Sequence, residues 1–160
     1  MTVTWCWAMP NSRTFSITPI AEILRRLVGD GKGWVDPYAN ESQLAERTND
    51  SNPDMPSMFH MDALEFLGTI GDGTVKGVLL DPPYSERQIR EKYDGWGNVK
   101  QITPILDEAA RAIKAGGLAI SFGWNSNGLG KNRGFLHSEV HLIAHGGQHN
   151  DTIVTVEQKQ

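Results

Sequence analysis

The chain has 160 residues, of which 39% are hydrophobic, and this is enough for about one domain with its own core. Its net charge of -4 argues against a broad polyanion-binding surface, so any contact with nucleic acid would have to be local. The lone Cys6 excludes an internal disulfide, and no apolar run approaches the length of a membrane span or a secretory leader. We therefore expect a soluble, cytoplasmic protein without membrane contact.

An aromatic segment and an amphipathic helix open the chain. Residues 5–11 combine aromatic and turn-forming residues, which fits a docking lid and a piece of core equally well. Thr18 then offers an N-cap with Pro19 at the first helical position, and apolar residues at helical spacing predict a helix up to residue 28. The glycine-rich residues 29–33 follow this helix, whereas a phosphate loop follows a strand, so we interpret them as a helix stop.

A strand, a turn and a helix are predicted next, over residues 34–36, 37–42 and 43–47. This arrangement presents backbone N–H groups to an anionic or carboxylate ligand. The turn is therefore a candidate binding loop.

Two more short strands are predicted before the middle of the chain. Residues 47–50 form the first, and Asp50 at its end is a candidate ligand of ribose hydroxyls. Residues 58–61 form the second, and a helix follows that Asp62 and Glu65 would cap.

The most informative stretch is the apolar run at residues 75–80 and the four residues that follow it. The run predicts a strand that is buried on both faces, as in a parallel sheet. Pro82 has no N–H for a central ladder, and Pro83 restricts the residue before it to extended backbone, so the chain leaves the sheet at Asp81. Asp81 and Tyr84 should lie at the carboxyl edge of the sheet, where a carboxylate beside an aromatic ring can hold a planar amine.

Two segments offer basic residues for contact with phosphates. Arg87 and Arg90 lie in a densely charged stretch adjacent to Asp81. Lys131 and Arg133 lie in a segment that we predict to be a flexible basic loop.

The second half of the chain predicts a helix at residues 103–114, a buried strand at 118–122, and an antiparallel hairpin of strands at 136–145 and 152–156. Alternation of strands and helices before a closing hairpin predicts the α/β class. The sheet should be mainly parallel, with about seven short strands and an antiparallel last member.

Four histidines repeat at an interval of four residues: His137, His141, His145 and His149. On a helix they would share one face and suggest a metal site. Residues 140–143 have strand character, however, and the glycines at 146 and 147 would break a helix, so we expect no metal.

Two motifs carry a resemblance to a known family. Asp81-Pro82-Pro83-Tyr84 resembles the catalytic motif of the amino-methyltransferases that methylate adenine N6 in DNA with S-adenosylmethionine. Asp36-Pro37-Tyr38-Ala39-Asn40 resembles the cofactor loop of these enzymes, with Asn40 at the position of a glycine. Asparagine tolerates left-handed backbone better than most residues. Overall, the chain is similar to the small adenine methyltransferases of phages and prophages.

The resemblance implies a Rossmann-like methyltransferase fold and a role for each matching residue. Asp81 and the Pro82 carbonyl would accept hydrogen bonds from the target amine, while Tyr84 stacks on a flipped-out base. The residues implied to bind the cofactor are Asp36, Pro37, Tyr38, Ala39, Asn40, Asp50 and Asp62.

The implied protein is a single methyltransferase domain over residues 1–160, without a separate target-recognition domain. Its partner would be double-stranded DNA with a flipped base, and a homodimer or a recognition subunit would supply specificity. An RNA or other amine substrate is the alternative, and a non-catalytic S-adenosylmethionine-binding module is a further one. A phosphate-handling nucleotide domain is disfavoured because the chain has no phosphate loop.

Overall fold

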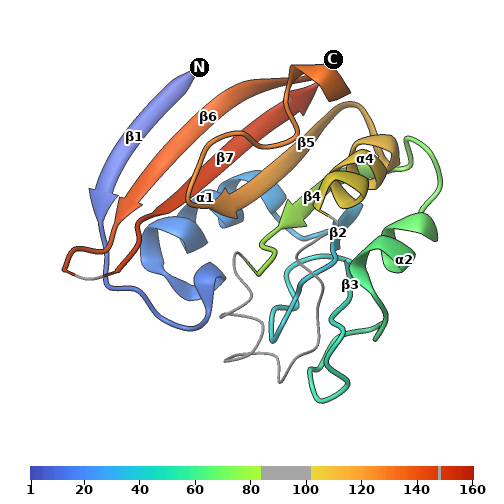
Figure 1. Cartoon of the computed structure of the whole chain (residues 1–160), viewed down its shortest axis with the longest axis horizontal. Coiled ribbons are helices and arrows are strands. Elements are labelled where there is room, and N and C mark those ends of the chain that lie inside the picture. Colours follow the sequence, from blue (N-terminus) through green and yellow to red (C-terminus); the bar gives the residue numbers. More distant parts are fainter. Residues whose placement is uncertain (84–101, 148) are drawn as a thin grey trace.

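A mixed seven-stranded sheet forms the centre of this computed structural model, which describes residues 1–83, 102–147 and 149–160 (Figure 1). The strands are β1 (Thr2–Trp7), β2 (Trp34–Asp36), β3 (Arg47–Thr48), β4 (Val75–Leu80), β5 (Ile113–Gly123), β6 (Phe135–Ala144) and β7 (Thr152–Lys159). They lie in the order β1-β6-β7-β5-β4-β2-β3, and only β7 is antiparallel to its neighbours. The predicted α/β fold with a closing antiparallel hairpin is confirmed.

The seven strands are not the seven that the sequence pattern predicts. Residues 58–61 form only one isolated bridge, between Phe59 and Asn49. The remaining strand is β1, which pairs in parallel with β6 at the sheet edge. Its residues Val3, Trp5 and Trp7 are 64%, 66% and 59% exposed, so residues 5–7 of the aromatic segment are part of an exposed edge strand.

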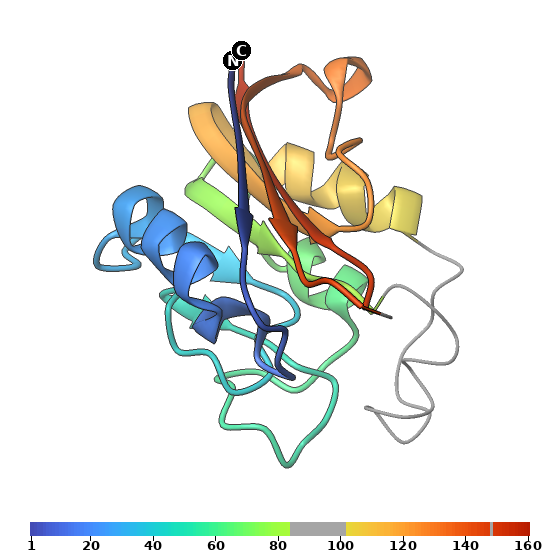
Figure 2. The same cartoon turned by 90° about the vertical axis from the view of Figure 1, so that its left-hand side faces the viewer.

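Helices cover both faces of the sheet (Figure 2). The helix α1 (Thr18–Val28) packs on one face against β-strand residues that include Leu79, Ile120 and Ile143. The helices α2 (Ala63–Gly68) and α4 (Ile102–Ala112) pack on the other face with Val78, Leu80 and Ala119. Two short 3-10 turns, η1 (Thr14–Ser16) and η3 (Lys131–Arg133), complete the described elements.

The helix α1 begins one residue earlier than its sequence suggests. Ile17 is the N-cap residue and makes no side-chain capping bond, so the prediction of Thr18 as the N-cap is wrong. Pro19 still lies in the first turn, where its missing N–H costs nothing. At the other end Gly29 adopts a φ of 64°, which ends the helix as predicted.

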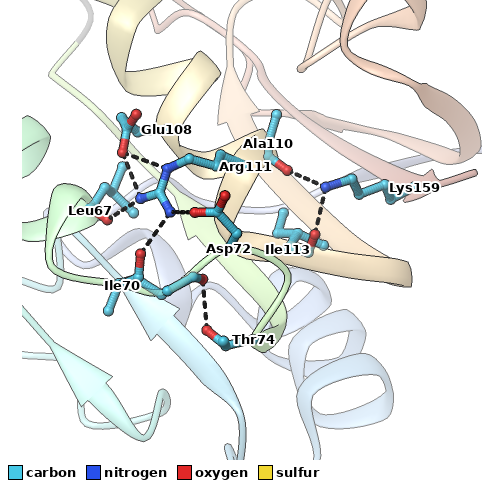
Figure 3. A network of polar contacts seen from close by, with 10 residues as sticks. Leu67, Ile70, Asp72, Thr74, Glu108, Ala110, Arg111, Ile113 and Lys159 are labelled. Carbon is cyan, nitrogen blue, oxygen red and sulfur yellow. Dashed lines mark hydrogen bonds and ion pairs between the residues drawn. The ribbon is translucent and has the colours of Figure 1, made fainter.

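The boundary between α4 and β5 is also earlier than predicted. The helix ends at Ala112 rather than at Lys114, because Ile113 already pairs with Val75 of β4. The Lys159 ammonium from β7 donates to the carbonyls of Ala110 and Ile113 at 2.6 and 2.7 Å, which stabilises this end of the helix (Figure 3).

Arg111 joins α4 to α2 at the same edge (Figure 3). Its guanidinium donates to the carbonyls of Leu67 and Ile70 at 3.1 and 2.8 Å, and it pairs with Glu108 and Asp72. Bonds of this kind satisfy the carbonyls that a helix leaves free at its end. The network fixes the amino edge of the sheet, opposite the edge at which β4 ends.

Among the described residues, no helix combines the length and the apolar character that crossing a membrane requires.

Candidate functional site

The carboxyl ends of four parallel strands bring the predicted site residues to one edge of the sheet. β2, β3, β4 and β5 run in the same direction, so their ends meet there. Asp36 is the last residue of β2, Asp50 follows β3, and Asp81 follows β4. The edge therefore gathers three carboxylates, at the position where sheets of this type bind ligands.

The loop after β2 is a tight turn that its own backbone and two acids hold in place. Asp36 Oδ1 accepts the Tyr38 N–H at 3.0 Å, and the Ala39 N–H donates to the Asn49 carbonyl at 2.9 Å. Asn40 has a φ of 51°, and its N–H donates to Asp50 Oδ2 at 2.9 Å. The left-handed backbone expected of Asn40 is present, and Asn40 is the sole described non-glycine residue with a positive φ.

The helix predicted at residues 43–47 does not form. The Ser42 hydroxyl accepts the Leu44 N–H at 3.3 Å, and the Glu46 N–H donates to the Gly31 carbonyl at 3.1 Å. β3 begins at Arg47, so too few residues remain for a helix. The prediction of a helix N-terminus facing an anion is wrong, and the N–H groups of Tyr38 and Asn40 in the turn bind the protein's own carboxylates instead.

Asp36 is a buried acid with a perturbed pKa. It is 0% exposed, and burial raises its pKa well above the ordinary value. The Tyr38 N–H opposes this increase, while the negative charges of Asp81 and Asp50 add to the rise in pKa. Its Oδ2 is buried and has no hydrogen-bond partner among the described residues.

Asp50 follows β3, and Asp62 follows residues 58–61 and precedes α2. Both side chains have a structural role. Asp50 is buried, and its Oδ1 accepts the Asn52 N–H at 2.9 Å in addition to the Asn40 bond. Asp62 caps α2 by accepting the Leu64 N–H at 2.8 Å, as predicted. Their proposed contacts with a cofactor stay predictions.

Asn49 connects these loops and was missed by sequence reasoning. Its side-chain amide donates to the carbonyls of Pro37 and Met61 at 3.1 and 3.0 Å, and its Oδ1 accepts the Met61 N–H at 3.1 Å. Asn49 is fully buried. These three bonds use both N–H donors of its side chain and one of the two lone pairs of its Oδ1. Nothing in a polar run of sequence distinguishes this asparagine from a turn residue.

A pocket of about 640 Å³ lies between the carboxyl edge of the sheet and the segment that contains η1 and α1. Residues 12–16 and α1 line one side, residues 38–44 line another, and residues 81–83 complete it. The ion pair between Arg13 and Glu41, at 2.7 Å, links two of these walls. Tyr38, Ala39 and Asn40 thus share one pocket with Asp81, Pro82 and Pro83, whereas Asp36, Pro37, Asp50 and Asp62 do not line it.

Three predicted site residues fall on a segment without a description. Tyr84, Arg87 and Arg90 lie outside the described residues, so their stacking and phosphate-binding roles stay predictions.

The structure does not bring Lys131 and Arg133 to this site. They form η3 directly before β6, whose first residue pairs with Lys159 at the end of β7, and this is the opposite edge of the sheet (Figure 1). Arg133 pairs with Asp107 at 2.6 Å and donates to the Leu129 carbonyl at 3.0 Å. The predicted flexible basic loop is therefore wrong, because the segment is a short helical turn held by an ion pair.

Two histidines of the four-residue repeat bind neighbouring segments. His141 lies on β6, as predicted, and its ring nitrogens contact Thr4 Oγ1 at 2.6 Å and Glu139 Oε2 at 2.8 Å. His145 Nδ1 lies 2.8 Å from the Ala8 carbonyl, which only accepts, so this nitrogen carries the proton. These bonds join β1 to β6.

No family model and no curated protein matches the sequence. Solved structures do resemble it. TrmN from Thermus thermophilus is 16% identical with a TM-score of 0.59, over 90% of this chain and 49% of that one. Precorrin-6y C5,15-methyltransferase from Geobacter metallireducens is 13% identical with a TM-score of 0.58, over 96% of this chain and 94% of that one. The chain has the Rossmann-like methyltransferase fold.

A further structure with the methyltransferase fold holds ligands. It is the 1,6-didemethyltoxoflavin-N1-methyltransferase of Burkholderia thailandensis, with bound 1,6-didemethyltoxoflavin and S-adenosylhomocysteine. It is 12% identical with a TM-score of 0.61, and the match covers 89% of this chain and 77% of that one. The chain spans about half the length of TrmN and most of the other two proteins.

Proposed function

We propose that the protein is an S-adenosylmethionine-dependent methyltransferase that methylates the exocyclic N6 amine of adenine in DNA, by direct transfer to a flipped-out base. One observation carries this proposal. The turn Asp81-Pro82-Pro83, which resembles the adenine methyltransferase motif, leaves β4 at the carboxyl edge and lines the same pocket as the loop after β2. That edge holds the ligand in open α/β sheets.

The residues around the pocket fit S-adenosylmethionine. A volume of about 640 Å³ suits a ligand of this size. Tyr38, Ala39 and Asn40 line the pocket beside Asp81, and Asp36 and Asp50 hold this loop in place through the N–H groups of Tyr38 and Asn40. Direct contacts of Asp36 and Asp50 with the cofactor stay predictions. When bound, the cofactor supplies a methyl group on a positively charged sulfur.

The amine would be held and activated by the turn after β4. The Asp81 carboxylate and the Pro82 carbonyl would accept hydrogen bonds from its two N–H groups, which draws electron density onto the nitrogen as it leaves the plane of the ring. The amine nitrogen would gain the methyl carbon as the carbon–sulfur bond of the cofactor breaks and S-adenosylhomocysteine leaves, and Asp81 or solvent would take the proton that the nitrogen loses. Positioning and electrostatics supply the rate, without a covalent intermediate.

Labelled methyl transfer tests the proposal. The protein is incubated with radiolabelled S-adenosylmethionine and unmethylated genomic DNA, total RNA, or protein, and modified nucleosides or residues are identified. We expect N6-methyladenine in DNA, and a loss of about 100-fold or more for Asp81→Ala. Calorimetry should show that Asp81→Ala still binds S-adenosylhomocysteine, and the exposed Asp54→Ala serves as the matched control. Undiminished transfer by Asp81→Ala would contradict the assignment.

A small heterocyclic amine is the second candidate substrate. The net charge of -4 does not favour a polyanion, and the Burkholderia thailandensis neighbour is named for methylation of a small ring compound. Transfer to free adenine or adenosine, but not to DNA, would favour this candidate.

A further inference from the structure

The register of the sheet places a tryptophan at the same edge as the turn after β4. Leu80 of β4 pairs with Ser121 of β5, and this is the last pair between the two strands, so the turn that begins at Asp81 and the end of β5 at Gly123 lie at the same edge of the sheet. Neighbouring strands lie about 4.8 Å apart. Trp124 follows Gly123 directly and is therefore the first residue beyond β5 at the edge that carries Asp81.

Trp124 is exposed although the chain on both sides of it is fixed. The residue is 46% exposed. Gly123 before it pairs with Ile153 of β7, and the Ser126 carbonyl after it accepts a hydrogen bond from His137 Nε2 at 2.7 Å. Two anchored points this close along the chain leave the indole little freedom to leave the edge.

The connection from β5 to β6 is held on the sheet without an α-helix. Glu157 of β7 is 0% exposed, and its carboxylate accepts the N–H groups of Leu129 and Gly130 at 2.5 and 3.0 Å. Gly128 has a φ of 55°, and a Cβ there would collide with this carboxylate. A buried carboxylate is costly unless it is fully hydrogen-bonded, so the path of the connection is specified by the fold rather than incidental.

We infer that Trp124 binds the acceptor by stacking on a planar ring that carries the amine. The acceptor is then an aromatic heterocycle such as a nucleobase, rather than an aliphatic amine or a protein amide. An exposed aromatic ring next to the amine-binding turn gives such a ring a flat apolar surface, while Asp81 and Pro82 hold the amine at its rim. This inference rests on the proposed methyl transfer and adds a binding residue to it.

Kinetics with two substitutions test the inference. Trp124→Ala should raise KM for unmethylated DNA by roughly 10- to 100-fold, the effect of losing one stacked base. Trp124→Phe should stay within about threefold of the wild type, because a ring remains. The matched control is Trp5→Ala, which removes a still more exposed indole from β1 at the far edge of the sheet. Affinity for S-adenosylhomocysteine should be unchanged in all three, and a wild-type KM for Trp124→Ala would overturn the inference.

A binding measurement separates failure of the inference from failure of the proposed function. The indole N–H signals of the ¹⁵N-labelled protein with S-adenosylhomocysteine are followed while oligodeoxyadenylate is added, and Trp124→Phe and Trp5→Phe assign two of them. A shift of the Trp124 signal alone supports stacking, even if no methyl group is transferred. Transfer to DNA without this shift overturns the inference and leaves the function standing. Absence of both overturns both.

Discussion

The backbone N–H of Asn40 donates to Asp50 Oδ2 at 2.9 Å while Asn40 itself holds a φ of 51°. One bond thus ties the turn after β2 to the segment after β3, and it requires left-handed backbone at a position without glycine. Asn40 also lines the pocket, so the shape of the pocket depends on this conformation.

Two substitutions of Asn40 should show whether ligand binding depends on its backbone conformation or on its side chain. Asn40→Gly should bind S-adenosylhomocysteine as the wild type does, because glycine adopts a positive φ without strain. Asn40→Val should lower the free energy of unfolding by about 1–2 kcal/mol and weaken binding, since a β-branched residue is strained there. Urea unfolding and calorimetry measure both effects. Equal binding by the two variants would mean that the turn does not shape the pocket.

The raised pKa of Asp36 predicts a pH dependence of stability. The native protein retains a proton on this carboxyl that the unfolded chain releases above about pH 3.9. The stabilisation is therefore complete below that pH and is lost as the pH rises through the folded pKa. Asp36→Asn removes this titration, so its Tm relative to the wild type should increase from about pH 5 to about pH 8. The Tm of the exposed Asp54→Asn variant should depend on pH as the Tm of the wild type does. A Tm of Asp36→Asn with the same pH dependence as the wild type would contradict the prediction.

Glu157→Gln should destabilise the connection between β5 and β6. The substitution replaces one of the two accepting oxygens with a donor that faces the N–H of Leu129 or Gly130. A loss of roughly 1–3 kcal/mol in the free energy of unfolding is expected for a buried donor without a partner. Urea unfolding measures it, with Glu22→Gln on the exposed side of α1 as the matched control. A difference of less than about 0.5 kcal/mol between the two variants would show that the buried bonds contribute little.

Gly77→Ala should disturb the contact between β2 and β4. Gly77 pairs with Trp34, and a Cβ at this position would meet the Trp34 ring. Overpacking of this kind costs about 1–3 kcal/mol. Gly68→Ala, at the end of α2 where a Cβ meets no atom within 4 Å, should be neutral or stabilising by about 0.5–1 kcal/mol. Similar unfolding midpoints for the two variants would indicate that Trp34 moves aside without cost.

Sequence pattern predicted the elements whose apolar residues face a core. β4, β5, the hairpin of β6 and β7, and α1 each carry a periodic apolar pattern, and each forms within a few residues of the predicted range. The capping role of Asp62 and the left-handed turn at Asn40 were also predicted, because both depend on local chemistry.

The errors arise where tertiary contacts decide the outcome. β1 buries little of its own surface, so its pattern does not distinguish a strand from a lid. The segment at residues 43–47 favours helix locally, but bonds from Glu46 and Ser42 and the early start of β3 exclude it. The far position of Arg133 follows from the connection that Glu157 holds, and no local pattern around Glu157 indicates that it binds this connection.

The place of β7 between β5 and β6 sets an order of assembly. β6 and β1 reach the rest of the sheet only through this strand, which comes last among the described elements. During synthesis, the β1 residues leave the ribosome first but cannot take their place in the complete sheet until residues 152–159 have emerged. The two exposed tryptophans of β1, Trp5 and Trp7, therefore stay outside the complete sheet until β7 has been synthesised. A nascent chain halted before β7 would expose an unpaired strand edge to chaperones.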